Sequence, residues 1–199
     1  MITHLVGLSL GPTSSVESGV AVREVATGDL IYLDKLFSMN DVNLFFENYT
    51  SLKNSIICVS LPWDNTMLEG KWRVLSKPYQ FIHSKGNFPN SDNWMQRFST
   101  RGCDLFNSLK GQGVDIIRYE VYLTRQKFNL YSNYKERSSS DCKYLQSMLK
   151  NEYNFELPPN MMPVAQLEAI VGTLLAEEKL KNNTKQIFKF RDLDVINMN

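Results

Sequence analysis

The sequence predicts an α/β domain built on a mixed sheet, in which three antiparallel strands are extended by parallel strands and flanked by helices. Three short strand patterns open the chain, and turn residues separate them. Continuous apolar runs bounded by turn residues follow later, as in parallel strands that are buried on both faces. Helical patterns lie between these runs, as crossover connections between parallel strands require.

The opening ribbon is predicted from three strands, at residues 5–10, 16–25 and 30–36. The turn at residues 11–15, Gly-Pro-Thr-Ser-Ser, is rich in small and hydroxylated residues. Its backbone N–H groups could face an anion. The Thr-Gly-Asp turn at residues 27–29 joins the second and third strands and makes the ribbon antiparallel.

The middle of the chain alternates helix and strand. Residues 41–49 form a predicted helix that Ser38 or Asn40 can cap, with Asp41 in its first turn. The remaining predicted elements before residue 130 are a strand at 55–61, a helix at 94–109 and a strand at 114–122.

Two helices close the predicted domain, at residues 134–153 and 163–181. Pro163 suits the first position of the last helix, and lysines occupy its end. The apolar stripe of this helix includes Val164, Val171 and Leu174, and Glu168 falls on the same stripe. A carboxylate there requires a partner, a metal ion or a solvent-filled cleft.

Composition sets the size and class of the molecule. With 199 residues, 43% of them hydrophobic and 22% charged, the chain can form one globular domain with a full core. We expect this domain over residues 1–184, with residues 63–94 as a long loop or insertion that shows no sustained period. Residues 185–199 are expected to add an edge strand at 187–190 and then to fray.

Charge and cysteine usage argue against several classes of protein. The 22 Lys and Arg residues against 21 Asp and Glu give a net charge of +1, not the basic signature of non-specific phosphate binding. Three widely spaced cysteines without a CxxC pair indicate neither a disulfide framework nor a thiolate zinc site. Because no signal-peptide pattern and no apolar run of membrane-spanning length is present, we expect a soluble protein of the cytoplasm.

Several segments carry a resemblance to a known family. In chain order they include VGLSLG, ICVSLPW, RFSTRGCD, IIRYEVYLTR and VAQLEAIVGTLLAEEKL. They resemble a large uncharacterised family of predicted nucleases with the ribonuclease-H-like fold, which Holliday-junction resolvases of the RuvC type, transposases and actin-like ATPases share. The resemblance covers nearly the whole chain. It implies hydrolysis of nucleic-acid phosphodiesters by two Mg²⁺ or Mn²⁺ ions, about 4 Å apart, held by converging carboxylates.

Carried over residue by residue, the resemblance implies a site drawn from several elements. Glu120, in the fifth strand, and Glu168, in the last helix, match metal-binding carboxylates of the family pattern. Arg101 and Asp104 match the Arg and Asp of a helix motif, and Lys135 matches a common lysine. Lys135 or Arg101 would then stabilise charge on the phosphate.

Two carboxylates of the family pattern are missing. Ser9 and Ser60 stand where the family has the aspartates of its first and fourth strands. Asp64, just past the fourth strand, is the carboxylate that could replace the one missing at Ser60, although an Asp there also suits a turn cap. Because hydroxyls are poorer ligands than carboxylates for a hard dication, we expect weak binding of Mg²⁺ or Mn²⁺.

The surviving glutamates also have structural explanations. Glu120 alternates with Arg118 and Tyr122 along the predicted strand, as a solvent-facing or salt-bridged residue does. Glu168 is equally consistent with an ion pair to a basic residue at the sheet edge: Arg101, Arg118 or Lys135.

Two functions from different classes therefore remain open. In the first, the protein is a divergent metal-dependent nuclease that uses Glu120, Glu168 and Asp64 or Asp104. In the second, the domain has lost catalysis and serves as a binding or scaffolding module, with the aromatic-rich segment 63–94 in contact with a partner, either bases of a nucleic acid or another protein. The near-neutral charge and the two serines favour the second function, and the two glutamates keep the first open.

Overall fold

A computed structural model describes residues 1–11, 16–49, 52–60, 105, 108–109, 114, 116–119, 121–135, 137–190 and 193–198. The strands are β1 (His4–Ser9), β2 (Ser18–Glu24), β3 (Leu30–Leu36), β4 (Ser55–Ser60), β5 (Ile116–Tyr119), β6 (Thr184–Phe190) and β7 (Leu193–Met198). The helices are α1 (Met39–Asn48), α4 (Val121–Lys127), α5 (Ser139–Glu152) and α6 (Val164–Leu180), with a 3-10 turn at Leu52–Asn54.

The strands of this described part form one mixed sheet, in the order β3-β2-β1-β4-β5-β7-β6. β1, β2 and β3 pair antiparallel, and β4 and β5 extend β1 in parallel. The predicted α/β class is therefore confirmed, including an antiparallel ribbon that parallel strands extend. β1 lies between β2 and β4, so both of its edges are hydrogen-bonded.

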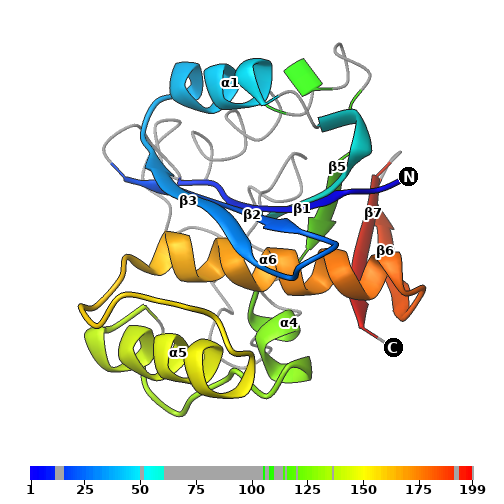
Figure 1. Ribbon diagram of the computed structural model, residues 1–199. Coiled ribbons are helices and arrows are strands. Elements are labelled where there is room, and N and C mark those ends of the chain that lie inside the picture. The colour runs from blue at the N-terminus through cyan, green and yellow to red at the C-terminus, as the bar shows by residue number, and fades with distance from the viewer. Residues whose placement is uncertain are drawn as a thin grey trace, which may run out of the picture.

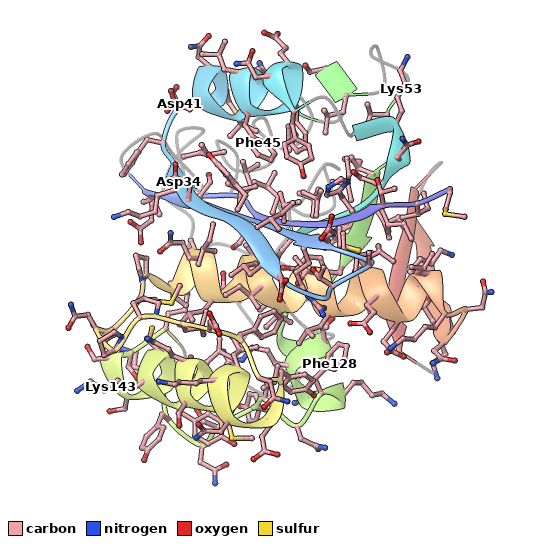
Figure 2. All side chains as sticks on the ribbon, in the orientation of Figure 1. Asp34, Asp41, Phe45, Lys53, Phe128 and Lys143 are labelled. Carbon is pink, nitrogen blue, oxygen red and sulfur yellow. The ribbon has the colours of Figure 1, made fainter. Side chains whose placement is uncertain are left out.

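Helices cover both faces of the sheet (Figure 1). α1 lies on one face and α6 on the other, while α4 and α5 lie on the far side of α6. Side chains of β1 alternate between two cores: Val6 and Leu8 pack on the α1 side, and Leu5 packs on the α6 side. Phe45 points from α1 toward the sheet, as Figure 2 shows. Burial of both faces explains why β1 and β4 are continuous apolar runs in the sequence.

α6 is buried around nearly its whole circumference, not along a single stripe. Every residue from Leu167 to Ala176 is buried. The sheet covers one side of this helix, and α4 and α5 cover the other. A helix between two layers needs apolar residues all round, which is why the predicted stripe was too narrow.

Glycines allow α6 to lie unusually close to the sheet. A Cβ atom added at Gly7 of β1 would collide with the carbonyl oxygen of Ala169, and one added at Gly19 of β2 would collide with that of Ala165. A Cβ at Gly172 would meet Tyr119 Oη at 3.0 Å. These positions therefore need glycine because the backbones of helix and strands are in direct contact.

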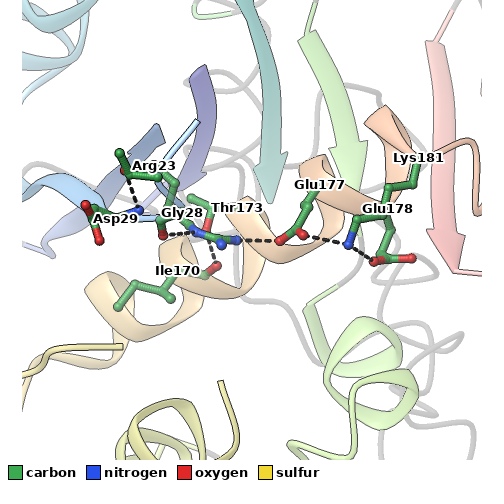
Figure 3. Close-up of polar contacts among 9 residues, drawn as sticks. Arg23, Gly28, Asp29, Ile170, Thr173, Glu177, Glu178 and Lys181 are labelled. Atoms are coloured by element: carbon green, nitrogen blue, oxygen red, sulfur yellow. Dashed lines mark hydrogen bonds and ion pairs between the residues drawn. The ribbon is translucent and has the colours of Figure 1, made fainter. Parts of the chain in front are cut away.

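Polar contacts fix the turn between β2 and β3 against α6 (Figure 3). Arg23 Nη1 lies 2.8 Å from Glu177 Oε2, and its Nε donates to the carbonyl oxygen of Gly28 at 3.2 Å. Lys181 Nζ lies 2.6 Å from the other oxygen of Glu177. The guanidinium also sits 5.0 Å from the ring centre of Phe155, a cation–π distance. The ribbon is thus tied to the C-terminal half of α6.

Two helix starts depend on serine caps. Ser38 caps α1 in a capping box with Asp41, so Ser38 and not Asn40 is the cap, and the helix begins at Met39. α5 begins at Ser139, after the cap Ser138, and not at residue 134 as predicted. The predicted start was wrong because Arg137 has a φ of 58°, which a right-handed helix cannot contain.

The fifth strand is shorter than predicted. β5 ends at Tyr119, and α4 begins at Val121, so the predicted strand at residues 121–122 is helix. The β-branched and aromatic residues there indicated a strand, but tertiary packing overrides such local preferences. Of the predicted helix at 94–109, Leu105, Ser108 and Leu109 are helical; its other residues, and the whole segment 63–94, lie outside the described residues.

The C-terminal tail forms two strands. β6 is an edge strand that covers the predicted residues 187–190, but the expected fraying after it is wrong. β7 pairs antiparallel with β6 and parallel with β5, where Arg118 faces Val195 and Tyr119 faces Ile196 in register. No helix within the described ranges is long and apolar enough to cross a membrane.

We predict that Gly7→Ala lowers the free energy of unfolding by about 2 kcal/mol, because the new methyl group forces α6 away from β1. Urea unfolding monitored by circular dichroism measures this. Ser140→Ala, at an exposed position of α5, is the control and should change the value by less than about 0.5 kcal/mol. An unchanged urea midpoint for Gly7→Ala would contradict the close contact.

Candidate functional site

Ser9 and Ser60 lie side by side at the carboxyl ends of two parallel strands. They are register partners of β1 and β4, and their exposed fractions are 4% and 9%. Gly7 faces α6, and Cys58 belongs to the core on the α6 side. Since residues two apart share a face of a strand, Ser9 and Ser60 also face α6.

Glu168 of α6 is buried beside this pair. Its exposed fraction is 4%, and its Oε2 accepts a hydrogen bond of 2.7 Å from Ser9 Oγ. Its backbone carbonyl accepts a hydrogen bond of 2.7 Å from Tyr119 Oη, which joins α6 to β5. The structure therefore brings Ser9, Ser60 and Glu168 together at one end of the parallel strands.

Among the described residues, the cation that pairs with Glu168 is Arg137, which precedes α5. Arg137 Nη2 lies 3.4 Å from Glu168 Oε2, so one carboxylate oxygen contacts both Ser9 and Arg137. The Arg137 side chain is 34% exposed and the Glu168 side chain only 6%. The pair thus lies at the boundary between the core and solvent.

The sequence-based candidates for this ion pair were different. The prediction that Arg118 pairs with Glu168 is wrong. Tyr119 faces α6, so its neighbour Arg118 faces the other side of the sheet. The prediction that Lys135 pairs with Glu168 is also wrong, because Lys135 is exposed and forms no ion pair with Glu168 within the described part of the chain. Arg101, the third candidate, lies outside the described residues. No spacing or motif in the sequence indicated Arg137.

A second, fully buried ion pair supports the loop that carries Arg137. Arg125 of α4 donates two hydrogen bonds to Asp141 of α5, at 3.1 Å and 2.7 Å. Ser132 Oγ donates to Asp141 at 2.8 Å, and the backbone N–H of Arg137 donates at 2.9 Å. The Arg125 and Asp141 side chains are 1% and 3% exposed. Asp141 therefore holds the backbone of Arg137 in place.

The protonation of Asp141 follows from these partners. Burial alone would raise the pKa of this carboxyl, but the hydrogen bonds and charge of Arg125, with those from Ser132 and Arg137, outweigh it and hold the pKa below its usual value. The side chain is therefore an anion at neutral pH, and the pair is well satisfied for a buried one.

The donor set of the described site does not fit Mg²⁺ or Mn²⁺. It contains one carboxylate, two serine hydroxyls and a guanidinium, whereas such ions prefer several carboxylate oxygens. No group of three or more His, Cys, Asp or Glu residues that could hold a metal ion occurs among the described residues. The other sequence-predicted site residues, Glu120, Asp64, Arg101 and Asp104, lie outside them.

The turn after β1 is less available to an anion than the sequence suggested. The backbone N–H of Gly11 donates to Ser18 Oγ at 2.9 Å, so this donor is already engaged within the ribbon. Residues 12–15 of the turn lie outside the described part.

A hollow of about 350 Å³ lies on the opposite face of the sheet, between β3 and α1. The Tyr32 and Phe45 rings lie 5.3 Å apart there, and Asp41, its one carboxylate, already caps α1 through the backbone N–H of Ser38. This hollow is therefore not a second candidate for hydrolysis. Its lining residues are Tyr32, Leu36, Asp41, Leu44, Phe45, Asn48 and Tyr49.

Comparison with solved structures identifies proteins of similar fold. A structure of RuvC from Thermus thermophilus matches with a TM-score of 0.50 and 10% identity, over 90% of this chain and 96% of that one. The fold is that of RuvC. T. thermophilus RuvC in complex with a Holliday junction substrate matches with the same TM-score and coverage at 11% identity. No protein-family model matches the chain, and no curated protein does.

The RuvC-like fold confirms the predicted ribonuclease-H-like architecture. At 10–11% identity the likeness concerns the fold alone. The function of this chain must therefore be argued from its site residues and not from the fold alone.

We predict that Asp141→Asn lowers the free energy of unfolding at pH 7 by about 3 kcal/mol or more, because Arg125 is left buried without its counter-charge. The folded-state pKa of Asp141 is held below its usual value of 3.8, so the wild-type advantage is fully present well above that value, declines as the pH falls below it, and is lost as the pH passes through the lower folded-state pKa. Urea unfolding at pH 7 and pH 3 tests both statements. Asp29→Asn, at an exposed turn, should behave like wild type at both pH values.

Proposed function

We propose that this chain is a nucleic-acid-binding domain of RuvC-like fold that does not hydrolyse its ligand. The observation that supports this proposal is the state of Glu168: its Oε2 accepts from Ser9 at 2.7 Å and pairs with Arg137 at 3.4 Å. A carboxylate so engaged is a structural anion and a poor ligand for a dication.

The chemistry of the neighbouring residues supports the loss of hydrolysis. Ser9 and Ser60 occupy the ends of β1 and β4, where the ribonuclease-H-like resemblance places aspartates. Two-metal hydrolysis depends on carboxylates that draw both ions to the phosphate. With hydroxyls at both positions, the described site keeps its polarity and loses most of its negative charge.

The same change favours binding of a phosphodiester. Serines in place of the two aspartates, together with Arg137 beside Glu168, make the site attractive to an anion without help from a metal ion. One solved relative in fold is a RuvC complex with a Holliday junction substrate, which makes branched DNA the first ligand to test. Since the net charge of the chain is only +1, we expect local contacts at this site, not an extended basic surface, to provide the affinity.

The second candidate is a divergent metal-dependent nuclease, related to the uncharacterised family of predicted nucleases. One observation favours it: Glu168 remains buried beside the ends of β1 and β4. In this version Glu120, Glu168 and Asp64 hold Mg²⁺ or Mn²⁺, and Lys135 or Arg101 stabilises charge on the phosphate.

We predict that the wild-type protein binds four-way-junction or duplex DNA with equal affinity in EDTA and in Mn²⁺, because the contacts do not pass through a metal ion. Fluorescence anisotropy measures the affinity, and electrophoresis of the same samples detects cleavage. We expect no cleavage above the EDTA control. Mn²⁺-dependent cleavage that Glu168→Gln removes would instead establish the nuclease.

We also predict that calorimetric titration of the wild type with millimolar Mn²⁺ gives no saturable heat, since one paired carboxylate is a weak site. The nuclease candidate requires a weak binding heat that Glu120→Gln abolishes. Glu152→Gln, which changes an exposed carboxylate of α5, is the matched control for loss of charge.

A further inference from the structure

Arg137 combines accessibility with a fixed position at the edge of the site. Its side chain is 34% exposed, while the carboxylate that it contacts is 6% exposed. Solvent therefore reaches the arginine side chain but hardly reaches that of Glu168. The positive charge is thus the outward-facing part of the pair.

The backbone of Arg137 is held in a conformation that its residue type disfavours. Its φ is 58°, in the left-handed region. The other non-glycine residues with positive φ in the described part are all asparagines, which tolerate this region: Asn129, Asn154 and Asn182. Unfavourable backbone conformations persist where the surrounding structure imposes them, and they cluster at functional sites.

The buried network explains how this conformation is imposed. Asp141 accepts the backbone N–H of Arg137 at 2.9 Å and is itself fixed by two hydrogen bonds from Arg125. At its other end, the guanidinium contacts Glu168, which Ser9 orients. Arg137 is therefore held through both its backbone and its side chain, so little conformational freedom remains to be lost on binding.

We propose that Arg137 is the residue through which this site contacts a phosphate of the nucleic acid, so that a guanidinium takes the part that divalent cations play in carboxylate-rich sites. This inference rests on the proposed function and names its binding residue. A planar guanidinium suits phosphate oxygens, and one N–H donated to Glu168 fixes its orientation. Glu168 then positions the guanidinium, and its negative charge repels the phosphate.

The test measures DNA affinity in EDTA by fluorescence anisotropy over a range of salt concentrations. Arg137→Gln should weaken binding. It should also make the negative slope of log affinity against log salt shallower by about 0.9, the value for one lost phosphate contact. Arg137→Gly should do the same, and it keeps the test valid if glutamine disturbs the loop, because glycine accepts the positive φ. Lys143→Gln removes an exposed charge of α5 and serves as the control with an unchanged slope.

Glu168→Gln gives the sharpest contrast. If Arg137 binds the phosphate, removal of the opposing carboxylate tightens binding equally in EDTA and in Mn²⁺; if Glu168 binds through a metal ion, the same variant weakens binding in Mn²⁺. Wild-type binding that neither Arg137 variant weakens overturns this inference and leaves the proposed function standing. Wild-type protein that binds no DNA in EDTA or in Mn²⁺ overturns both.

Discussion

The direct contact between α6 and the backbones of β1 and β2 determines the rest of the structure. Gly7 and Gly19 have no side chain to hold the helix away, so the carbonyl groups of Ala169 and Ala165 lie against the strands. At this separation the Glu168 side chain reaches Ser9 at the end of β1, although the two residues are 159 positions apart in the sequence. A helix displaced by one methyl group would move this carboxylate away from its partners, so helix packing and site geometry depend on the same interaction.

Much of the fold is predictable from the sequence because its signals are local and consistent. Short strand patterns and turn residues mark β1 to β3, and the continuous apolar run at 55–61 marks a strand that is buried on both faces. The errors occur where tertiary contacts override local preference. β5 ends earlier than predicted because residues 121–122 form the start of α4, although their types favour strands. The tail forms β7 because an edge of β5 is available for pairing.

The site was harder to predict than the fold, for a physical reason. The resemblance identified Ser9, Ser60 and Glu168, which the structure brings together, because each lies in a regular element with its own pattern. Arg137 lies between elements, and its position depends on Asp141 and Arg125, a pair whose contact no spacing rule indicates. Ion pairs of this kind, between a loop and a distant helix, cannot be predicted from the sequence and are recognised only in the folded structure.

The burial of α6 also bears on the order in which the chain folds during synthesis. The β1-β2-β3 ribbon leaves the ribosome before α6 and can pair locally, but its α6-facing side, with Leu5 and Ala21, gains its cover only when α6 emerges. Until then the nascent chain presents an apolar surface interrupted by glycines. Contacts of such long sequence separation form slowly, so this half-covered ribbon is the species that a chaperone would encounter during translation.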